Sequence, residues 1–208
     1  MKNIFIILLL LGSMVGQGQV KQRSALKGFN GAIQLHSLGW TSEYFKFLDE
    51  GASSGYGGGF RVGYGITELI EPYIGFDFTK MIIGSNIEAE SFKMTHFDMG
   101  VRFNFAGTVH RFRPFAEGGY SLLKGTVKQV STQTGNADLI FKGGKPHLGG
   151  GIGFFPKIPI SIFAKGIFTL GKKSTATIDG VDILDKPDVT TFRITVGVNF
   201  NISELTKN

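Results

Sequence analysis

The 208-residue sequence contains no cysteine. Without cysteine the chain has no disulfide, no thiol nucleophile and no thiolate ligand for zinc. Beyond its first residues it also has no apolar run near the roughly 20 residues that a helix needs to cross a bilayer. These absences exclude a disulfide-stapled scaffold, cysteine-based catalysis and a helical membrane protein.

Clustered charge of one sign is missing as well. The formal net charge is +6, and the basic residues are spread along the chain. Nucleic-acid binding uses a contiguous basic face, so we expect no nucleic-acid partner. The four histidines stand apart without the close spacing of metal ligands, so we expect no metal and no cofactor.

The N-terminus has the three parts of a secretory signal peptide. Lys2 carries positive charge, Ile4–Leu11 form a short apolar run, and Gly16 and Gly18 are small residues at positions −3 and −1 of a possible cut. The apolar run is too short to span a membrane. We predict a signal peptide over residues 1–18 and one domain over residues 19–208.

Eight segments of this domain alternate apolar and polar residues with the period of a β-strand. In the last segment Phe192, Ile194, Val196, Val198, Phe200 and Ile202 alternate with Thr191, Arg193, Thr195, Gly197, Asn199 and Asn201. The other seven segments lie around residues 29–36, 59–66, 73–79, 96–105, 116–122, 147–154 and 161–170. The pattern predicts an all-β fold, an eight-stranded antiparallel up-and-down barrel.

The connections between these segments alternate in length. Those at 67–71, 106–113 and 155–158 are short, and those at 41–54, 81–91, 124–136 and 171–188 are long and more polar. Short periplasmic turns and long outer loops are typical of outer-membrane barrels. Within the long connections, Asp179-Gly180 indicates a hairpin turn, and residues 41–50 indicate a short amphipathic helix. Gly135-Asn136 indicates a turn that caps an extension of the fifth and sixth strands above the membrane.

Alternation alone also fits a soluble barrel with an apolar interior. In a membrane barrel the polar face would fill the lumen instead, and its charges would have to pair. The predicted lumen residues are Arg61, Asp77, His96, Asp98, Arg102, Glu117, Lys145, His147, Lys165 and Arg193. Their charges are close to balance, Glu71 adds a further acid, and glycines on the same face leave room for them.

Aromatic residues near the strand ends favour the membrane interpretation. Interfacial girdles predict this distribution. The candidates are Trp40, Tyr44 and Tyr56 on the loop side and Phe105, Phe112, Phe115, Phe154 and Phe155 on the turn side. We therefore predict a monomer in the bacterial outer membrane, in contact with its lipid and lipopolysaccharide. Arg111 and Arg113, beside a short turn, are expected to be solvated or near lipid headgroups.

The C-terminal pattern Thr195-x-Gly197-x-x-Phe200-x-Ile202 resembles the terminal-strand signal of outer-membrane barrels, with Ile202 in place of the usual aromatic residue. Together with Gly63-Tyr64-Gly65 and the stretch from Arg113 to Tyr120, it makes the chain similar to the OmpA-, OmpX- and OmpW-like small barrels. The resemblance implies insertion by the barrel-assembly machinery.

An eight-stranded barrel is only wide enough inside for side chains. We therefore predict a plugged, non-enzymatic barrel with a role in envelope structure or surface contact. The resemblance to OmpW-like barrels leaves open a narrow or lateral route for small hydrophobic solutes, with Phe163 and Ile167 lining a pocket or packing the lumen. A lipid-modifying enzyme built on His96, Asp98 and His147 is the third alternative, against which a lumen hydrogen-bond network is favoured.

The signal-peptide prediction is testable on protein extracted from membranes. Cleavage after Gly18 leaves Gln19 as the first residue, and we expect intact-mass measurement and N-terminal sequencing to find a start within a few residues of it. A mass that includes residues 1–18 would contradict the prediction.

Overall fold

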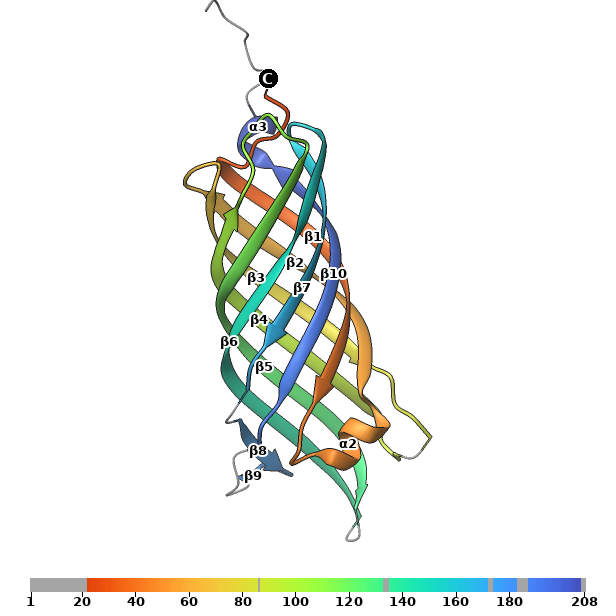
Figure 1. The fold of residues 1–208 in the computed structure, drawn as a ribbon. Helices are drawn as coiled ribbons and strands as arrows, with labels where there is room; N and C mark the ends of the chain where they lie inside the picture. The colour runs from red at the N-terminus through yellow and green to blue at the C-terminus, as the bar shows by residue number, and fades with distance from the viewer. Residues whose placement is uncertain (1–21, 86, 133–134, 172–173, 183–186, 207–208) are drawn as a thin grey trace, which may run out of the picture.

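The period-two pattern folds into a closed barrel of eight antiparallel strands (Figure 1). The structure is a computed structural model that describes residues 22–85, 87–132, 135–171, 174–182 and 187–206. The predicted signal peptide, residues 1–18, lies outside the described residues. Among the described residues, no helix is long and apolar enough to span a membrane.

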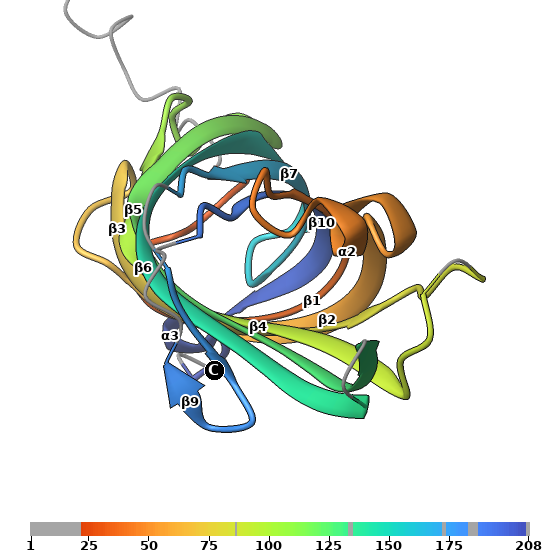
Figure 2. The ribbon, with the colours of Figure 1, turned by 90° about the horizontal axis from the view of Figure 1, so that it is seen from below.

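Each barrel strand pairs with the next one along the chain, and the last pairs with the first. The strands are β1 (Gly28–Thr41), β2 (Ser54–Gly65), β3 (Ile70–Met81), β4 (Ser91–Asn104), β5 (Phe112–Thr132), β6 (Gly135–Lys157), β7 (Ile160–Thr169) and β10 (Thr190–Asn201). Closure runs from the Asn30–Asn201 pair to the Thr41–Thr190 pair. Figure 2, seen from the loop end, shows the resulting ring of strands.

The apolar face of the strands lies outside the barrel. Ile33 and Ile194 are 67% and 57% exposed, whereas Arg193 and Glu117 on the opposite face are 0% and 2% exposed. A soluble barrel would have the reverse arrangement, so the soluble alternative is excluded. We call the outward apolar residues of the eight strands the apolar belt.

The aromatic girdle is only partly as predicted. Tyr44, Tyr56, Phe105 and Phe112 are exposed and Phe154 is half-buried, but Trp40, Phe115 and Phe155 are buried. The prediction was wrong for these three because each continues the inward face of its strand: Trp40 follows His36 and Leu38 at intervals of two.

The long connections contain the predicted helix and hairpin. The helix is α2 (Lys46–Gly51), and the hairpin joins β8 (Thr175–Ile178) to β9 (Val181–Asp182). Asp179 and Gly180 form its turn with positive φ angles of 48° and 82°. The predicted extension of the fifth and sixth strands is confirmed, because β5 and β6 continue through the connection from 124 to 136. The predicted turn residues were misplaced, because Gly135 and Asn136 begin β6.

Inside the loop end of the barrel lies an apolar cluster that we call the apolar cap. Its members are Leu38, Trp40, Phe45, Leu48, Ala52, Met81, Phe92, Met94, Leu123, Val127, Val130, Leu139, Phe141, Ala176 and Val189. Trp40 stacks on Phe141 at 5.8 Å between ring centroids and donates its indole N–H to the Ala52 carbonyl at 2.6 Å. The cap joins α2, β8 and the extended β5–β6 hairpin to the barrel.

At the opposite, turn end, the segment before β1 lies against the barrel. Arg113 is 1% exposed and its guanidinium lies 3.1 Å from the Glu68 carboxylate, which also accepts from the Leu26 amide at 2.9 Å. The expectation that Arg113 is solvated was therefore wrong. Arg111, by contrast, is exposed.

The belt makes a prediction about stability. Replacing Ile194, a lipid-facing residue of β10, with arginine is expected to cost about 2–4 kcal/mol of unfolding free energy in lipid vesicles. Val181→Arg is the control, because Val181 is 71% exposed on β9 outside the barrel wall. Denaturant titration of vesicle-embedded protein measures both, and equal costs would contradict a lipid-facing belt.

Candidate functional site

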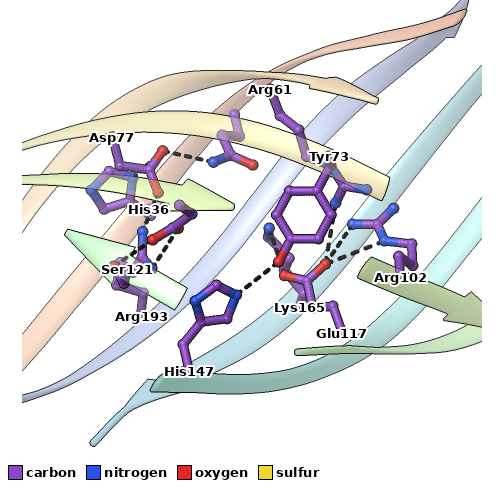
Figure 3. Close-up of polar contacts among 12 residues, drawn as sticks. His36, Arg61, Tyr73, Asp77, Arg102, Glu117, Ser121, His147, Lys165 and Arg193 are labelled. Carbon is purple, nitrogen blue, oxygen red and sulfur yellow. Dashed lines mark hydrogen bonds and ion pairs between the residues drawn. The ribbon is translucent and has the colours of Figure 1, made fainter. Parts of the chain in front are cut away.

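The inward polar side chains form two clusters stacked along the barrel (Figure 3). The first, here the Glu117 cluster, contains Glu117, Arg61, Arg102, Lys165 and Glu71. The second, the Arg193 cluster, contains Arg193, Asp77, Asp98, Gln34 and Ser121. The Glu117 cluster lies nearer the turn end, and the apolar cap lies beyond the Arg193 cluster.

Glu117 on β5 accepts from three cations that come from three other strands. Its carboxylate lies 3.1 Å from Arg61 on β2, 3.0 Å from Arg102 on β4 and 2.9 Å from Lys165 on β7. Arg61 also pairs with Glu71 on β3 at 3.0 Å. One carboxylate therefore ties together strands on different sides of the lumen.

Aromatic rings fill the space around these cations. The Arg61 guanidinium lies 4.0 Å from the centroid of Tyr73, and the Arg102 guanidinium lies 3.8 Å from that of Phe115. Phe163, which is 3% exposed, lies 5.6 Å from Arg102. Such cation–π contacts are strongest where water is excluded. Phe163 therefore packs against the Glu117 cluster.

Arg193 on β10 bridges two carboxylates across the lumen. Its two terminal nitrogens lie 2.5 Å from Asp77 and 2.7 Å from Asp98. The second oxygens of these carboxylates accept from Gln34 at 2.6 Å and from Ser121 at 2.5 Å. The Arg193 cluster carries one positive and two negative charges, and each carboxylate has a second polar partner.

The remaining predicted lumen residues are also buried and hold polar contacts. His147 lies 2.9 Å from the Tyr73 hydroxyl between the two clusters, and His96 lies 3.3 Å from the Thr191 hydroxyl. Lys145 donates to the Val189 carbonyl beside the apolar cap. All ten residues singled out from the sequence thus lie inside the barrel, and Glu71 joins them at 1% exposure.

Glycine makes room for two of the carboxylates. A Cβ atom at Gly59 would overlap the Asp77 carboxylate, and one at Gly63 would overlap the Glu71 carboxylate. Both glycines face the lumen on β2, on the same side as Arg61. The narrow interior therefore holds these ion pairs only where the facing position has no side chain.

The two clusters together have balanced charge. Four cations, Arg61, Arg102, Lys165 and Arg193, lie with four carboxylates, Glu71, Asp77, Asp98 and Glu117, while Lys145 lies outside both clusters beside the apolar cap. Buried ions need such partners because their desolvation is costly. Within the described part of the chain no group of three histidine or acidic residues is placed to hold a metal ion.

His96, Asp98 and His147 do not form a linked acid–base chain. Asp98 accepts from Arg193 and Ser121, while His96 contacts Thr191 and His147 contacts Tyr73. The carboxylate that would orient a histidine base is therefore bonded to other groups. This arrangement fits a structural network better than proton transfer.

The residues of the predicted assembly signal lie near the end of β10. Thr195 is fully buried, Gly197 pairs with Gln34 on β1, and Phe200 pairs with Gly31. Ile202 does not continue the strand face as expected, because Asn201 caps the short helix α3 (Ile202–Leu205) and accepts from the Glu204 amide at 3.0 Å. The role of this signal in assembly stays a prediction.

The apolar cap and the Arg113–Glu68 pair were not predicted from the sequence. Both combine residues that are distant in sequence, such as Trp40 with Phe141 and Arg113 with Glu68. One part of the cap was predictable. Leu38 and Met94 lie on the same strand faces as His36 and His96, so the alternation pattern places them inside the barrel.

The geometry around Glu117 predicts a large effect of its removal. Glu117→Gln leaves Arg102 and Lys165 buried without a carboxylate partner, so we expect a loss of about 3–5 kcal/mol of unfolding free energy. Glu90→Gln, at an exposed position before β4, is the control and should stay near the wild-type value. Denaturant titration followed by tryptophan fluorescence gives both, and a Glu117→Gln protein as stable as the control would refute the network.

The described fold is shared with solved bacterial outer-membrane proteins. Neisserial surface protein A is similar with a TM-score of 0.62 and 14% identity over 85% of this chain and 98% of that one. OprG from Pseudomonas aeruginosa gives 0.57 and 9% over 86% and 98%. Ail, the attachment invasion locus protein of Yersinia pestis, gives 0.53 and 16% over 84% and 100%.

No protein-family model matches the sequence, and none of the curated proteins matches it. At identities of 9–16% the structural likeness establishes the fold. The exposed apolar belt is the outer surface expected of a protein surrounded by lipid. The closed ring of strands also leaves no unpaired strand edge in that layer. The chain has the fold of the small eight-stranded β-barrels of the bacterial outer membrane, with an apolar outer face that fits a lipid surrounding.

Proposed function

We propose that the protein is a closed, non-enzymatic barrel that does not conduct solutes and whose outer end makes surface contacts. The observation that carries this proposal is the filling of the interior by the Glu117 cluster, the Arg193 cluster and the apolar cap. Eight strands enclose room for side chains only. An aqueous path would have to break buried ion pairs and pass through the cap.

The non-enzymatic part of the proposal draws support from the bonding of the candidate chemical groups. His96, Asp98 and His147 are each buried and engaged with partners inside the lumen. A lipid substrate would approach from the belt or the rim, where these groups are not exposed. Their arrangement therefore favours a stabilising role.

Surface contact draws support from the construction of the loop end. The β5–β6 hairpin extends beyond the ring of strands, and α2 and β8 pack on the apolar cap (Figures 1 and 2). The hairpin and β8 are joined by four register pairs, from Leu139–Ile178 to Lys142–Thr175. A platform of ordered elements on a membrane barrel is suited to contact with other surfaces, because little ordering entropy is lost on binding.

A side route for small hydrophobic solutes has one observation in its favour. β7 ends at Thr169, opposite His147, whereas β6 extends beyond His147 toward the loop end as far as Gly135. On the loop side of His147, residues 139–142 of β6 pair with the short strand β8. The barrel wall is therefore built differently there, and this is where lateral passage would be sought.

Shortening the β5–β6 hairpin separates a role in surface contact from a role in envelope integrity. Val127 and Leu139 are register partners, so residues 128–138 can be replaced by an Asn-Gly turn. We expect a deletion strain complemented with this variant to keep resistance to bile salts and large antibiotics while losing adhesion to solid surfaces. The wild-type gene should restore both properties, and gel mobility with and without boiling checks that the variant folds.

The outcomes distinguish the alternatives. Adhesion that survives the shortened hairpin would contradict surface contact as the role of this end. Steady single-channel steps of the purified wild-type protein in planar bilayers would contradict a closed lumen. The side route would be favoured instead if the deletion strain lost uptake of small hydrophobic solutes and both the wild-type gene and the shortened-hairpin gene restored it.

A further inference from the structure

The apolar belt ends in a lysine on four neighbouring strands. On β3, Phe78 is followed on the outward face by Lys80, and on β5, Leu122 is followed by Lys124. Outward positions of β4 and β6 carry Lys93 and Lys142 on the same side of the belt, toward the loop end. All four are exposed, and we call them the lysine patch.

The strand register makes the patch continuous. Lys80 lies directly opposite Lys93, and Lys124 lies directly opposite Lys142. Lys124 also lies opposite Thr95, which places Lys93 on the diagonal from it. Directly opposed side chains have their Cβ atoms about 5 Å apart and diagonal ones about 7–8 Å. The four ammonium groups can therefore converge on one ligand.

The four lysines of the patch have no ion-pair partner within the described part of the protein. None of the ion pairs there includes Lys80, Lys93, Lys124 or Lys142. Like charges directly opposite one another destabilise a sheet. Two such pairs side by side indicate that an anion from outside the chain balances them.

On the described residues of β1, β2 and β10 no lysine occupies the corresponding outward position. The outward residues that follow the belt on β1 are Ser37, Gly39 and Thr41, and β10 begins at Thr190 at this end of the barrel. On β2 the corresponding position opposite Lys80 is Tyr56. A general affinity for the headgroup layer would not require this asymmetry, whereas a ligand-binding site would.

A hollow lies beside the Lys124–Lys142 pair. It has a volume of about 490 Å³ and is lined by Leu122, Leu123, Lys124, Lys142, Gly143, Gly144 and Thr175. Gly144 provides its floor next to Tyr120, where a Cβ atom would approach the tyrosine ring to 2.6 Å. The hollow therefore places two ammonium groups beside the apolar side chain of Leu122, at the loop-end limit of the apolar belt.

We propose that the lysine patch binds the phosphate groups of a phosphorylated glycolipid of the outer leaflet, of the lipid A class, with an acyl chain along the belt. The proposal rests on the proposed function only in its placing of the loop end at the outer leaflet. Several phosphates on one amphiphile match several lysines above an apolar surface. A soluble polysaccharide would not use the apolar side of the hollow.

The test uses the full-length protein refolded in zwitterionic detergent and titrated with diphosphoryl lipid A. The variant Lys124→Gln/Lys142→Gln removes the pair at the hollow, and Lys27→Gln/Lys157→Gln removes the same charge at the turn end. We expect native mass spectrometry to report an affinity about thirtyfold weaker for the first variant and unchanged for the second. Dephosphorylated lipid A should bind the wild-type protein at least as weakly as diphosphoryl lipid A binds the first variant, because it offers no phosphate to any of the four lysines.

A second measurement separates binding from folding. In detergent without anionic lipid, the first variant should unfold at the same or a higher denaturant concentration than wild-type protein, because a like-charge contact is removed. Unchanged lipid A binding by that variant, or equal binding of dephosphorylated lipid A or phosphatidylglycerol, would overturn the proposal. If the protein does not conduct and does not bind lipid A, only this inference is refuted. If it shows channel activity, only the proposed function is refuted.

Discussion

Closure of the strand ring between β1 and β10 is the constraint on which the rest of the structure depends. In hydrocarbon no water replaces a missing backbone hydrogen bond, so a β-structure in a membrane must have no open edge. Twelve register pairs join the first and last strands and meet this requirement. Closure with only eight strands in turn makes the interior so narrow that its residues must fit one another.

The interior meets that demand in layers. Arg113 and Glu68 lie at the turn end, the Glu117 and Arg193 clusters follow, and the apolar cap fills the loop end. Each charged layer links strands that are not neighbours in the wall, as Arg193 on β10 does with Asp98 on β4. These contacts brace the ring from within, while the cap fixes the elements that stand above it.

The strand count, the outward apolar face and the β8–β9 hairpin were predictable because they depend on local periodicity and turn chemistry. Trp40 points inward because strand phase places it with His36, although its aromatic character and its position near the strand end suggested an interfacial residue. The partners of Arg193 and Arg113 were not predictable, since they depend on which residues face each other across the lumen. The lysine patch likewise appears only once the register sets Lys124 opposite Lys142.

The central claim is that this chain is a closed barrel embedded in the outer membrane through its apolar belt. Membrane fractionation combined with gel mobility before and after boiling tests it most directly. We expect recovery in the outer-membrane fraction and a distinct band for the unboiled protein, because a closed barrel resists detergent until it is heated. Recovery as a soluble periplasmic protein with the same mobility before and after boiling would contradict it.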